Sequence, residues 1–352
     1  MIFYLILSLI SVLFLIIADS LDNGKKAFSQ AFAIFLAIIS AIRYDVGFDY
    51  PVYYEVASQQ GDFLWEFLRF EFLSKIIVFT VWLFKLPYLI FFIYSFLTVY
   101  FVFQGLKRLM PDSLHIGLFI YALFPLFFID SFSLIRQHLA IAIIFYAISF
   151  LINRKFLTYI IIVCISGLIH SGSFVTILLI PMCFVKIKPW VFTFFVALTF
   201  VFGRQITLML LDISGFSSSY LSPEGVKGTG GNLIRFLMNG VALGLLFLQN
   251  RLNEKVHFFV GIFSLGILFY NLFGSFGHAG IRVFEYFSIS IVPLMPLVVK
   301  AFKPQRLVSI SACLILLVFN LSYISLTTRN EKKSALTPYS TIFTTDNKGK
   351  FK

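Results

Sequence analysis

Apolar residues run in long blocks along this chain, and short polar turns separate the blocks. A block of about 18 or more apolar residues with few charges is long enough to cross a bilayer as an α-helix. The blocks of this length lie at Met1–Ala18, Leu86–Leu106, Trp190–Leu211, Val256–Gly274 and Leu307–Leu326. Because every backbone polar group in a bilayer core must be paired internally, these blocks are expected to be helices. The pattern therefore predicts an all-α, polytopic integral membrane protein.

Shorter apolar stretches extend this pattern to a helical bundle of about 12–13 transmembrane segments. The predicted spans lie near residues 2–18, 27–43, 87–106, 114–130, 135–152, 156–170, 172–186, 189–211, 233–250, 256–274, 283–300 and 306–326. A further stretch, residues 67–85, is interrupted by Arg69, Glu71 and Lys75, and we expect it to form a re-entrant or surface helix. Residues 1–326 are thus predicted to be a single transmembrane domain, followed by a polar basic tail, 327–352.

The composition agrees with a membrane protein and also bears on its partners. Hydrophobic residues make up 59% of the chain and charged residues only 12%, whereas a soluble domain carries about a quarter charged residues. The formal net charge of +12 would suit nucleic acid, but many basic residues lie in short turns such as Lys25–Lys26, Lys107–Arg108 and Arg154–Lys155. This distribution follows the positive-inside rule. We therefore expect no nucleic-acid partner, and we expect these turns to be cytoplasmic.

The same rule assigns the most polar loops to the outer face of the membrane. These loops are residues 44–66, 131–136, 212–232 and 275–282, together with the helix end at His170. Within the third loop, Glu224 and the glycine-rich stretch Gly225–Gly231 predict a mobile segment. The tail, residues 327–352, falls on the outer face by this count as well.

Motifs for metal or nucleophile chemistry are missing from the sequence. Cys164, Cys183 and Cys313 lie singly inside apolar blocks and are interpreted as small hydrophobic residues. No HExxH, DxD, CxxC, GxSxG or phosphate-loop pattern occurs. We therefore expect no metal and no cofactor. The first apolar block lacks a basic leader and a small-residue cleavage site, and is interpreted as a retained helix.

Three arginines on the predicted outer face are candidates for binding an anion: Arg43, Arg136 and Arg282. A guanidinium group stays charged at any working pH and offers two parallel hydrogen bonds, which suits a pyrophosphate. Arg136 also lies in the first turn of its predicted helix, where backbone N–H groups favour an anion. The alternative is that these side chains extend toward lipid headgroups without any functional role.

Two further residues are candidates for proton transfer. Asp49 lies in a tyrosine-rich loop, and His170 ends a predicted helix, so either could act as a general base toward a sugar hydroxyl. The alternatives are a solvated loop carboxylate and a helix-capping histidine. The candidates for sugar contacts are Tyr50, Tyr53, Gln137 and Glu285, although Glu285 would serve equally as a structural partner for an arginine.

Three segments carry a resemblance to a known family. "IRYDVGFDYPVYY" (42–54), "SFSLIRQHLAIAI" (131–143) and "LIHSGSFVTILLIP" (168–181) resemble, in this order, motifs of the EpsG family, which includes Wzy-like polymerases of O-antigen, capsule and exopolysaccharide. His138 departs from the pattern, because a small residue is usual after the Arg-Gln pair. The motif positions are held here by Arg43, Gly47, Asp49, Tyr53, Arg136, Gln137, Leu139, Ala140 and His170.

The resemblance implies a glycosyltransferase that works without a metal at the outer face of the bacterial cytoplasmic membrane. Its substrates would be undecaprenyl-pyrophosphate-linked oligosaccharides, with membrane lipid around them and room for a chain-length regulator as partner. Asp49 or His170 would be the base, and Arg43, Arg136 and Arg282 would bind the pyrophosphate. Two other classes stay open: a flippase for lipid-linked oligosaccharides and a membrane acyltransferase that modifies a polysaccharide. A flippase often has two similar halves, which this sequence does not show.

Overall fold

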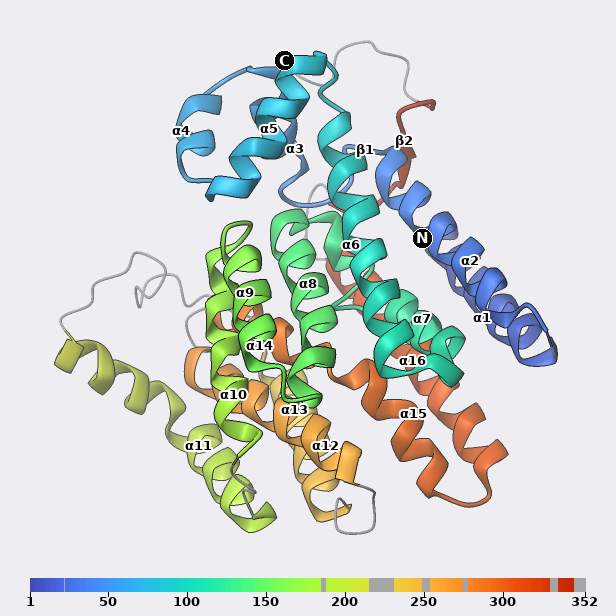
Figure 1. Cartoon of the computed structure of the whole chain (residues 1–352), viewed down its shortest axis with the longest axis vertical. Coiled ribbons are helices and arrows are strands. Elements are labelled where there is room, and N and C mark those ends of the chain that lie inside the picture. Colours follow the sequence, from blue (N-terminus) through green and yellow to red (C-terminus); the bar gives the residue numbers. More distant parts are fainter. Residues whose placement is uncertain are drawn as a thin grey trace. The chain divides into compact units, whose positions relative to one another are not determined.

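The computed structural model describes the chain except for residues 22, 185–187, 215–230, 249–253, 275–277, 330–334 and 345–352. Most of the described residues are helical, and the strands among them are two strands of two residues each (Figure 1). This confirms the all-α class expected from the apolar blocks. The predicted glycine-rich loop at Gly225–Gly231 lies outside the described residues except for Gly231, which begins a helix.

The chain divides into two compact units. Unit 1 comprises Met1–Phe150, Leu157–Ser173 and Arg306–Lys352, and unit 2 comprises Leu151–Phe156 and Phe174–Gln305. The helices mainly in unit 1 are α1 (Ile2–Ser20), α2 (Lys25–Ile42), α3 (Tyr50–Ser58), α4 (Phe63–Leu68), α5 (Phe72–Phe84), α6 (Leu89–Leu109), α7 (Leu114–Leu123), α8 (Ile135–Ile152), α9 (Phe156–Gly167) and α16 (Gln305–Arg329). Those of unit 2 are α10 (Leu179–Met182), α11 (Pro189–Ser214), α12 (Gly231–Leu248), α13 (Glu254–Phe273), α14 (His278–Ser288) and α15 (Ile291–Ala301). The predicted division into residues 1–326 and 327–352 stays a prediction.

Seven of the described helices are long and apolar enough to cross a membrane, or eight if a bent pair counts as one span. The bent pair joins Gly280–Ser288 to Ile291–Ala301 at an angle of 53°. The seven are Ile2–Ser20, Lys25–Ile42, Leu89–Leu109, Ile135–Ile152, Pro189–Leu210, Val256–Phe273 and Gln305–Leu326. The chain is therefore a multi-pass membrane protein.

Other predicted spans contain shorter or irregular helices. The predicted span 114–130 contains α7, which has 10 residues and ends at Leu123, two residues before Pro125. Since the residue before a proline is disfavoured in helical geometry, the helix stops there. The predicted span 172–186 begins as a 3-10 helix, Ser171–Leu178, and continues only to Met182 as α10. Continuous apolar sequence therefore overstates the length of the helices that it forms.

The interrupted stretch 67–85 forms α5, Phe72–Phe84, preceded by the short α4. With 13 residues, α5 is about 20 Å long, whereas a bilayer core is about 30 Å thick. A helix of this length does not cross a bilayer by itself. This length favours the re-entrant or surface helix that the charged residues in the stretch predicted.

Part of the C-terminal tail packs back onto unit 1 as a strap, defined here as residues 335–344. Strand β2 (Ser340–Thr341) pairs antiparallel with β1 (Arg43–Tyr44), so that Arg43 lies opposite Thr341 (Figure 1). The ring of Tyr339 stacks on that of Phe3, with centroids 3.6 Å apart. The strap therefore lies at the same end of unit 1 as the loop that begins at Arg43.

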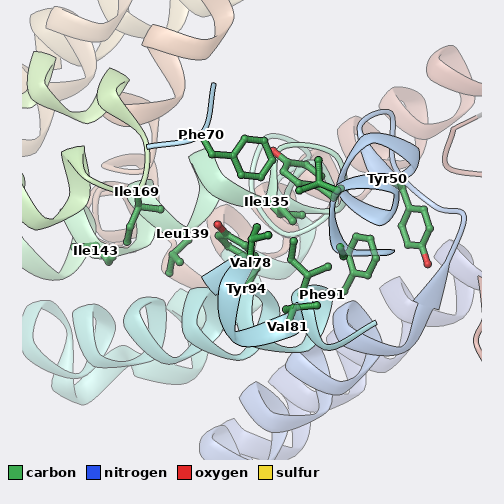
Figure 2. Close-up of a cluster of buried hydrophobic side chains, with 14 residues drawn as sticks. Tyr50, Phe70, Val78, Val81, Phe91, Tyr94, Ile135, Leu139, Ile143 and Ile169 are labelled. Carbon is green, nitrogen blue, oxygen red and sulfur yellow. The ribbon is translucent and has the colours of Figure 1, made fainter. Parts of the chain in front are cut away.

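A buried cluster at this end of unit 1 joins α3, α5, α6 and α8 (Figure 2). Tyr50 at the start of α3 stacks on Phe91 of α6, with nearly parallel rings and centroids 4.2 Å apart. Ile135 and Leu139 bring the first turns of α8 into the same cluster. The cluster thereby holds the residues around Tyr53 and Arg136 in one place.

Candidate functional site

The loop between α2 and α3 is docked against the turn that precedes α8. Gly47 has a φ of +114°, and a Cβ there would overlap the carbonyl oxygen of Phe132. The next residue, Phe48, donates its backbone N–H to the hydroxyl of Ser133 over 3.0 Å. A glycine is therefore needed at position 47 both for its backbone conformation and for this close approach. The contact joins the first motif to the second.

Arg43 is fully buried beneath this loop. Its guanidinium donates to the backbone carbonyls of Ser40, Val46 and Phe132, with 3.3 Å to each of the last two. It also lies between the rings of Phe91 and Phe132, 5.0 and 5.3 Å from their centroids. Burial lowers its pKa to about 10, so the group remains a cation at neutral pH. These contacts favour a structural role, and the predicted pyrophosphate contact of Arg43 stays a prediction.

A small polar cavity of about 10 Å³ lies beside Arg43. Its walls include the hydroxyl-bearing residues Ser40, Tyr94, Ser95, Thr98 and Ser131. This volume is about that of one water probe, so the cavity has no room for a sugar or a phosphate.

Arg136, in the first turn of α8, has a more open environment, with 19% of its side chain exposed. Its Nη1 donates to Oε2 of Glu71 at 2.6 Å, and its Nε donates to the hydroxyl of Tyr53 at 3.3 Å. The guanidinium carbon also lies 4.0 Å from the ring centroid of Phe70. Nη2 makes no hydrogen bond to any residue that the structure describes. Arg136 is thus held in a fixed position with part of its hydrogen-bonding capacity left over.

Glu71 connects Arg136 to the third motif. Its Oε1 accepts hydrogen bonds from the backbone N–H of Ser171 at 2.9 Å and from the Ser171 hydroxyl at 3.2 Å. Its other oxygen pairs with Arg136. One carboxylate therefore joins the start of α8 to the turn after α9, where His170 lies. From the sequence, Glu71 was interpreted only as a charge that interrupts an apolar stretch. Its two partners lie 65 and 100 positions away, so no local pattern predicts these contacts.

The two candidate bases lie in unit 1 near these contacts. Asp49 is half-buried at the N-cap of α3, and its backbone carbonyl accepts the N–H of Tyr53, the residue that contacts Arg136. His170 is half-buried and directly precedes Ser171, which Glu71 binds. Tyr53, Arg136 and the turn after His170 thus come together, and Asp49 lies one helical turn from Tyr53.

The remaining predicted site residues are more deeply placed or lie in unit 2. Tyr50 and Gln137 are buried, with exposed fractions of 0% and 2%. Arg282 and Glu285 both belong to α14 of unit 2, where Arg282 is half-buried and Glu285 is 1% exposed. They are three positions apart, and so lie on the same side of that helix.

A second polar group in unit 1 was not predicted. His138 is 2% exposed, and its Nε2 lies 3.5 Å from Oδ2 of Asp130. The hydroxyl of Tyr323 lies 3.4 Å from the other oxygen of Asp130. The sequence feature that could have predicted this pair is Asp130 at the end of an apolar stretch, eight positions before His138. Both residue types ligate metals, so the expectation of a metal-free protein stays a prediction.

The model of the EpsG family matches residues 26–341. The chain belongs to the EpsG family. No curated protein and no solved structure matches it. Membership in the EpsG family supports a role of the polysaccharide-polymerase type in a membrane, and the matched region contains all three motifs, the whole of unit 2 and most of unit 1.

Proposed function

We propose that this EpsG-family chain polymerises glycan repeat units carried on undecaprenyl pyrophosphate, at the outer face of the bacterial cytoplasmic membrane. One observation carries the proposal: three motifs that are far apart in the sequence meet at one end of unit 1. Gly47 packs on Phe132, Arg136 contacts Tyr53, and Glu71 joins Arg136 to Ser171. A cation, candidate bases and aromatic rings are thereby gathered at one boundary of the helical bundle.

In the proposed reaction, a hydroxyl oxygen of one repeat unit attacks the anomeric carbon of the growing glycan. The bond from that carbon to the lipid pyrophosphate breaks, and the pyrophosphate leaves with the bonding electron pair. Asp49 or His170 accepts the proton of the attacking hydroxyl. The product is a glycan longer by one repeat unit, together with free lipid pyrophosphate.

Arg136 is the proposed partner of the departing pyrophosphate. Its Nε and Nη1 are occupied by Tyr53 and Glu71, which hold the guanidinium plane in place. Nη2 is then available to stabilise the negative charge that develops on the leaving oxygen. The pyrophosphate contact of Arg282, which lies on α14 of unit 2, stays a prediction. Arg43 supports the site by holding the loop that leads to Asp49.

The sugar contacts are proposed to come from Tyr53 and from the open side of the Arg43–Tyr50 loop, where Phe48 is 47% exposed. Gln137 and Glu285 are also proposed to contact the sugar. Both side chains are buried, so each contact requires that a sugar hydroxyl reach a buried group. Tyr50 stacks on Phe91 inside the core, so its contribution is to fix the start of α3.

The proposal is tested by complementing a deletion strain with Arg136→Ala and running the polysaccharide on a gel. Loss of a preorganised hydrogen-bond donor to a developing anion lowers the rate by about 10²–10³. We therefore expect the ladder of long chains to disappear while single repeat units remain on the lipid carrier.

The matched control is Arg69→Ala, which removes an exposed arginine from an ion pair with Glu66 on α4. It should leave the ladder unchanged, and both variants should be present in the membrane at equal amounts. An unchanged ladder with Arg136→Ala contradicts the proposal. Failure of the deletion strain to export any repeat unit would point to a flippase, and a change in decoration alone would point to an acyltransferase.

A further inference from the structure

An apolar groove of about 180 Å³ lies between α2 and α6, away from the candidate site. The two helices run antiparallel: the hydroxyls of Ser40 and Ser95 meet at 2.8 Å toward one end, and Gln30 and Gln104 lie together at the other. The groove extends from the two glutamines to Ala37 and Phe96, close to the serine pair. Its lining residues are Gln30, Ala33, Ile34, Ala37, Phe96, Val99, Tyr100, Phe103 and Gln104. A groove with this lining suits a hydrocarbon chain.

At the end of the groove near the two glutamines, a lysine follows on the groove-lining face of each helix. Lys26 lies four residues before Gln30 on α2, and Lys107 lies four residues after Phe103 on α6. Residues four apart share a helix face, so both lysines extend the walls of the groove past its polar end. Both are exposed, and neither forms an ion pair with a carboxylate of the described residues. The mouth of the groove therefore carries two positive charges.

The neighbouring Arg108 is directed elsewhere. Its guanidinium carbon lies 5.0 Å from the ring centroid of Tyr146 and 4.8 Å from that of Phe150, both on α8. The positive charge at the groove thus comes from the lysine pair and not from every basic residue in this turn.

We propose that this groove binds an anionic phospholipid, with an acyl chain between α2 and α6 and the phosphate between Lys26 and Lys107. Opposite charge at the mouth favours an anionic headgroup over a zwitterionic one, as in the basic pockets between membrane helices that bind anionic lipids. Lys26 precedes Arg43 by 17 positions along α2, which corresponds to about 26 Å. The lipid is therefore drawn from the leaflet opposite to the Arg43 loop, and it is separate from any substrate bound there.

The test uses the purified full chain in a neutral detergent and measures the binding of phosphatidylglycerol and phosphatidylcholine by native mass spectrometry. Each lysine near a membrane surface contributes about 1 kcal/mol to anionic lipid binding. Lys26→Gln and Lys107→Gln should therefore each raise the dissociation constant for phosphatidylglycerol about fivefold, and together about thirtyfold. Binding of phosphatidylcholine should be weak and insensitive to both substitutions.

Two further variants separate the groove from general surface charge. Arg154→Gln with Lys155→Gln removes an exposed basic pair from another turn and should leave phosphatidylglycerol binding unchanged. Ile34→Trp, at a half-exposed groove wall (48%), should block the acyl chain and weaken binding although both lysines remain. Equal binding of the two lipids, equal loss in the Arg154/Lys155 control, or no effect of Ile34→Trp would overturn the proposal.

Discussion

Arg43 and Arg136 belong to the same unit and to neighbouring motifs, yet their environments differ in kind. Arg43 is fully buried, donates to three backbone carbonyls and lies between two phenylalanine rings. Arg136 is partly exposed, pairs with Glu71 and keeps Nη2 without a described protein partner. The sequence assigned both to the same anion. The difference teaches that two arginines of neighbouring motifs can differ in what they offer: the hydrogen bonds of Arg43 go to the fold, whereas Arg136 keeps a donor for the anion that we propose it binds.

The largest expected effect comes from Arg43→Ala. Without the guanidinium, the carbonyls of Ser40, Val46 and Phe132 lose a buried donor, and each such loss costs about 1–3 kcal/mol. We expect the free energy of unfolding to fall by at least about 3 kcal/mol. The measurements are the amount of protein in the membrane and the thermal unfolding of the purified chain in detergent.

Arg136→Ala is the matched comparison for this prediction. It should lower polymer formation while leaving protein abundance close to that of the unchanged chain. If Arg43→Ala is instead stable and folded but inactive, Arg43 contacts substrate, and the distinction drawn between the two arginines is wrong.

Gly47→Ala should have the next largest effect. The Cβ of an alanine at position 47 would overlap the Phe132 carbonyl. The backbone φ at this position, +114°, is also strained for any residue with a side chain. We expect the loop to separate from the turn before α8, with a loss of about 1–3 kcal/mol in unfolding free energy. Polymer length on the gel should fall in parallel, because Asp49 follows this turn.

Gly24→Ala is the control for the backbone strain alone. Gly24 also has a positive φ, +92°, but a Cβ there meets no atom within 4 Å. Gly24→Ala should lower the free energy of unfolding only through backbone strain, and polymer formation should be retained. Equal effects of the two substitutions would show that docking of Gly47 on Phe132 contributes nothing.

Glu71→Gln should have the smallest effect of the three. The substitution keeps the size of the side chain and its capacity to bind Ser171, but it removes the charge that holds Arg136. We expect about a tenfold slower polymerisation, which corresponds to about 1.4 kcal/mol of transition-state stabilisation. The initial rate of chain extension with purified protein and lipid-linked repeat units measures this change.

Glu66→Gln serves as the control, because Glu66 forms an exposed ion pair with Arg69 on the same segment. It should leave the rate unchanged. A double-mutant cycle with Arg136→Ala then tests whether Glu71 acts through Arg136. Additive effects of the two substitutions would contradict a positioning role for Glu71.

Those features of the fold that depend on continuous apolar sequence were predictable. The predicted span 135–152 coincides with α8, and Arg136 lies in its first turn as expected. Hydrophobicity alone did not show where α7 ends, because residues 124–129 are as apolar as the helix itself; the signal in the sequence is Pro125. Hydrophobicity reports burial or lipid contact, and both helical and irregular segments satisfy it.

The site was less predictable, since its contacts connect residues far apart in the chain. The partners of Arg43 are mostly backbone carbonyls, which have no sequence signature. Glu71 lies 65 positions from Arg136, and its charge suggested only an interruption of an apolar stretch. The pairing of Arg43–Tyr44 with Ser340–Thr341 involves strands of two residues each, too short to give an alternating pattern.

The strap has a consequence for biosynthesis. Thr341 lies opposite Arg43 but is added to the chain 298 residues later. At about 5–20 residues per second, this delay amounts to about 15–60 s of translation. During that time β1 lacks its strand partner, so we expect Arg43–Tyr44 to pair only after the strap has been added to the chain. A chain that ends before the strap would lack the β1–β2 pairing beside the loop that leads to Asp49.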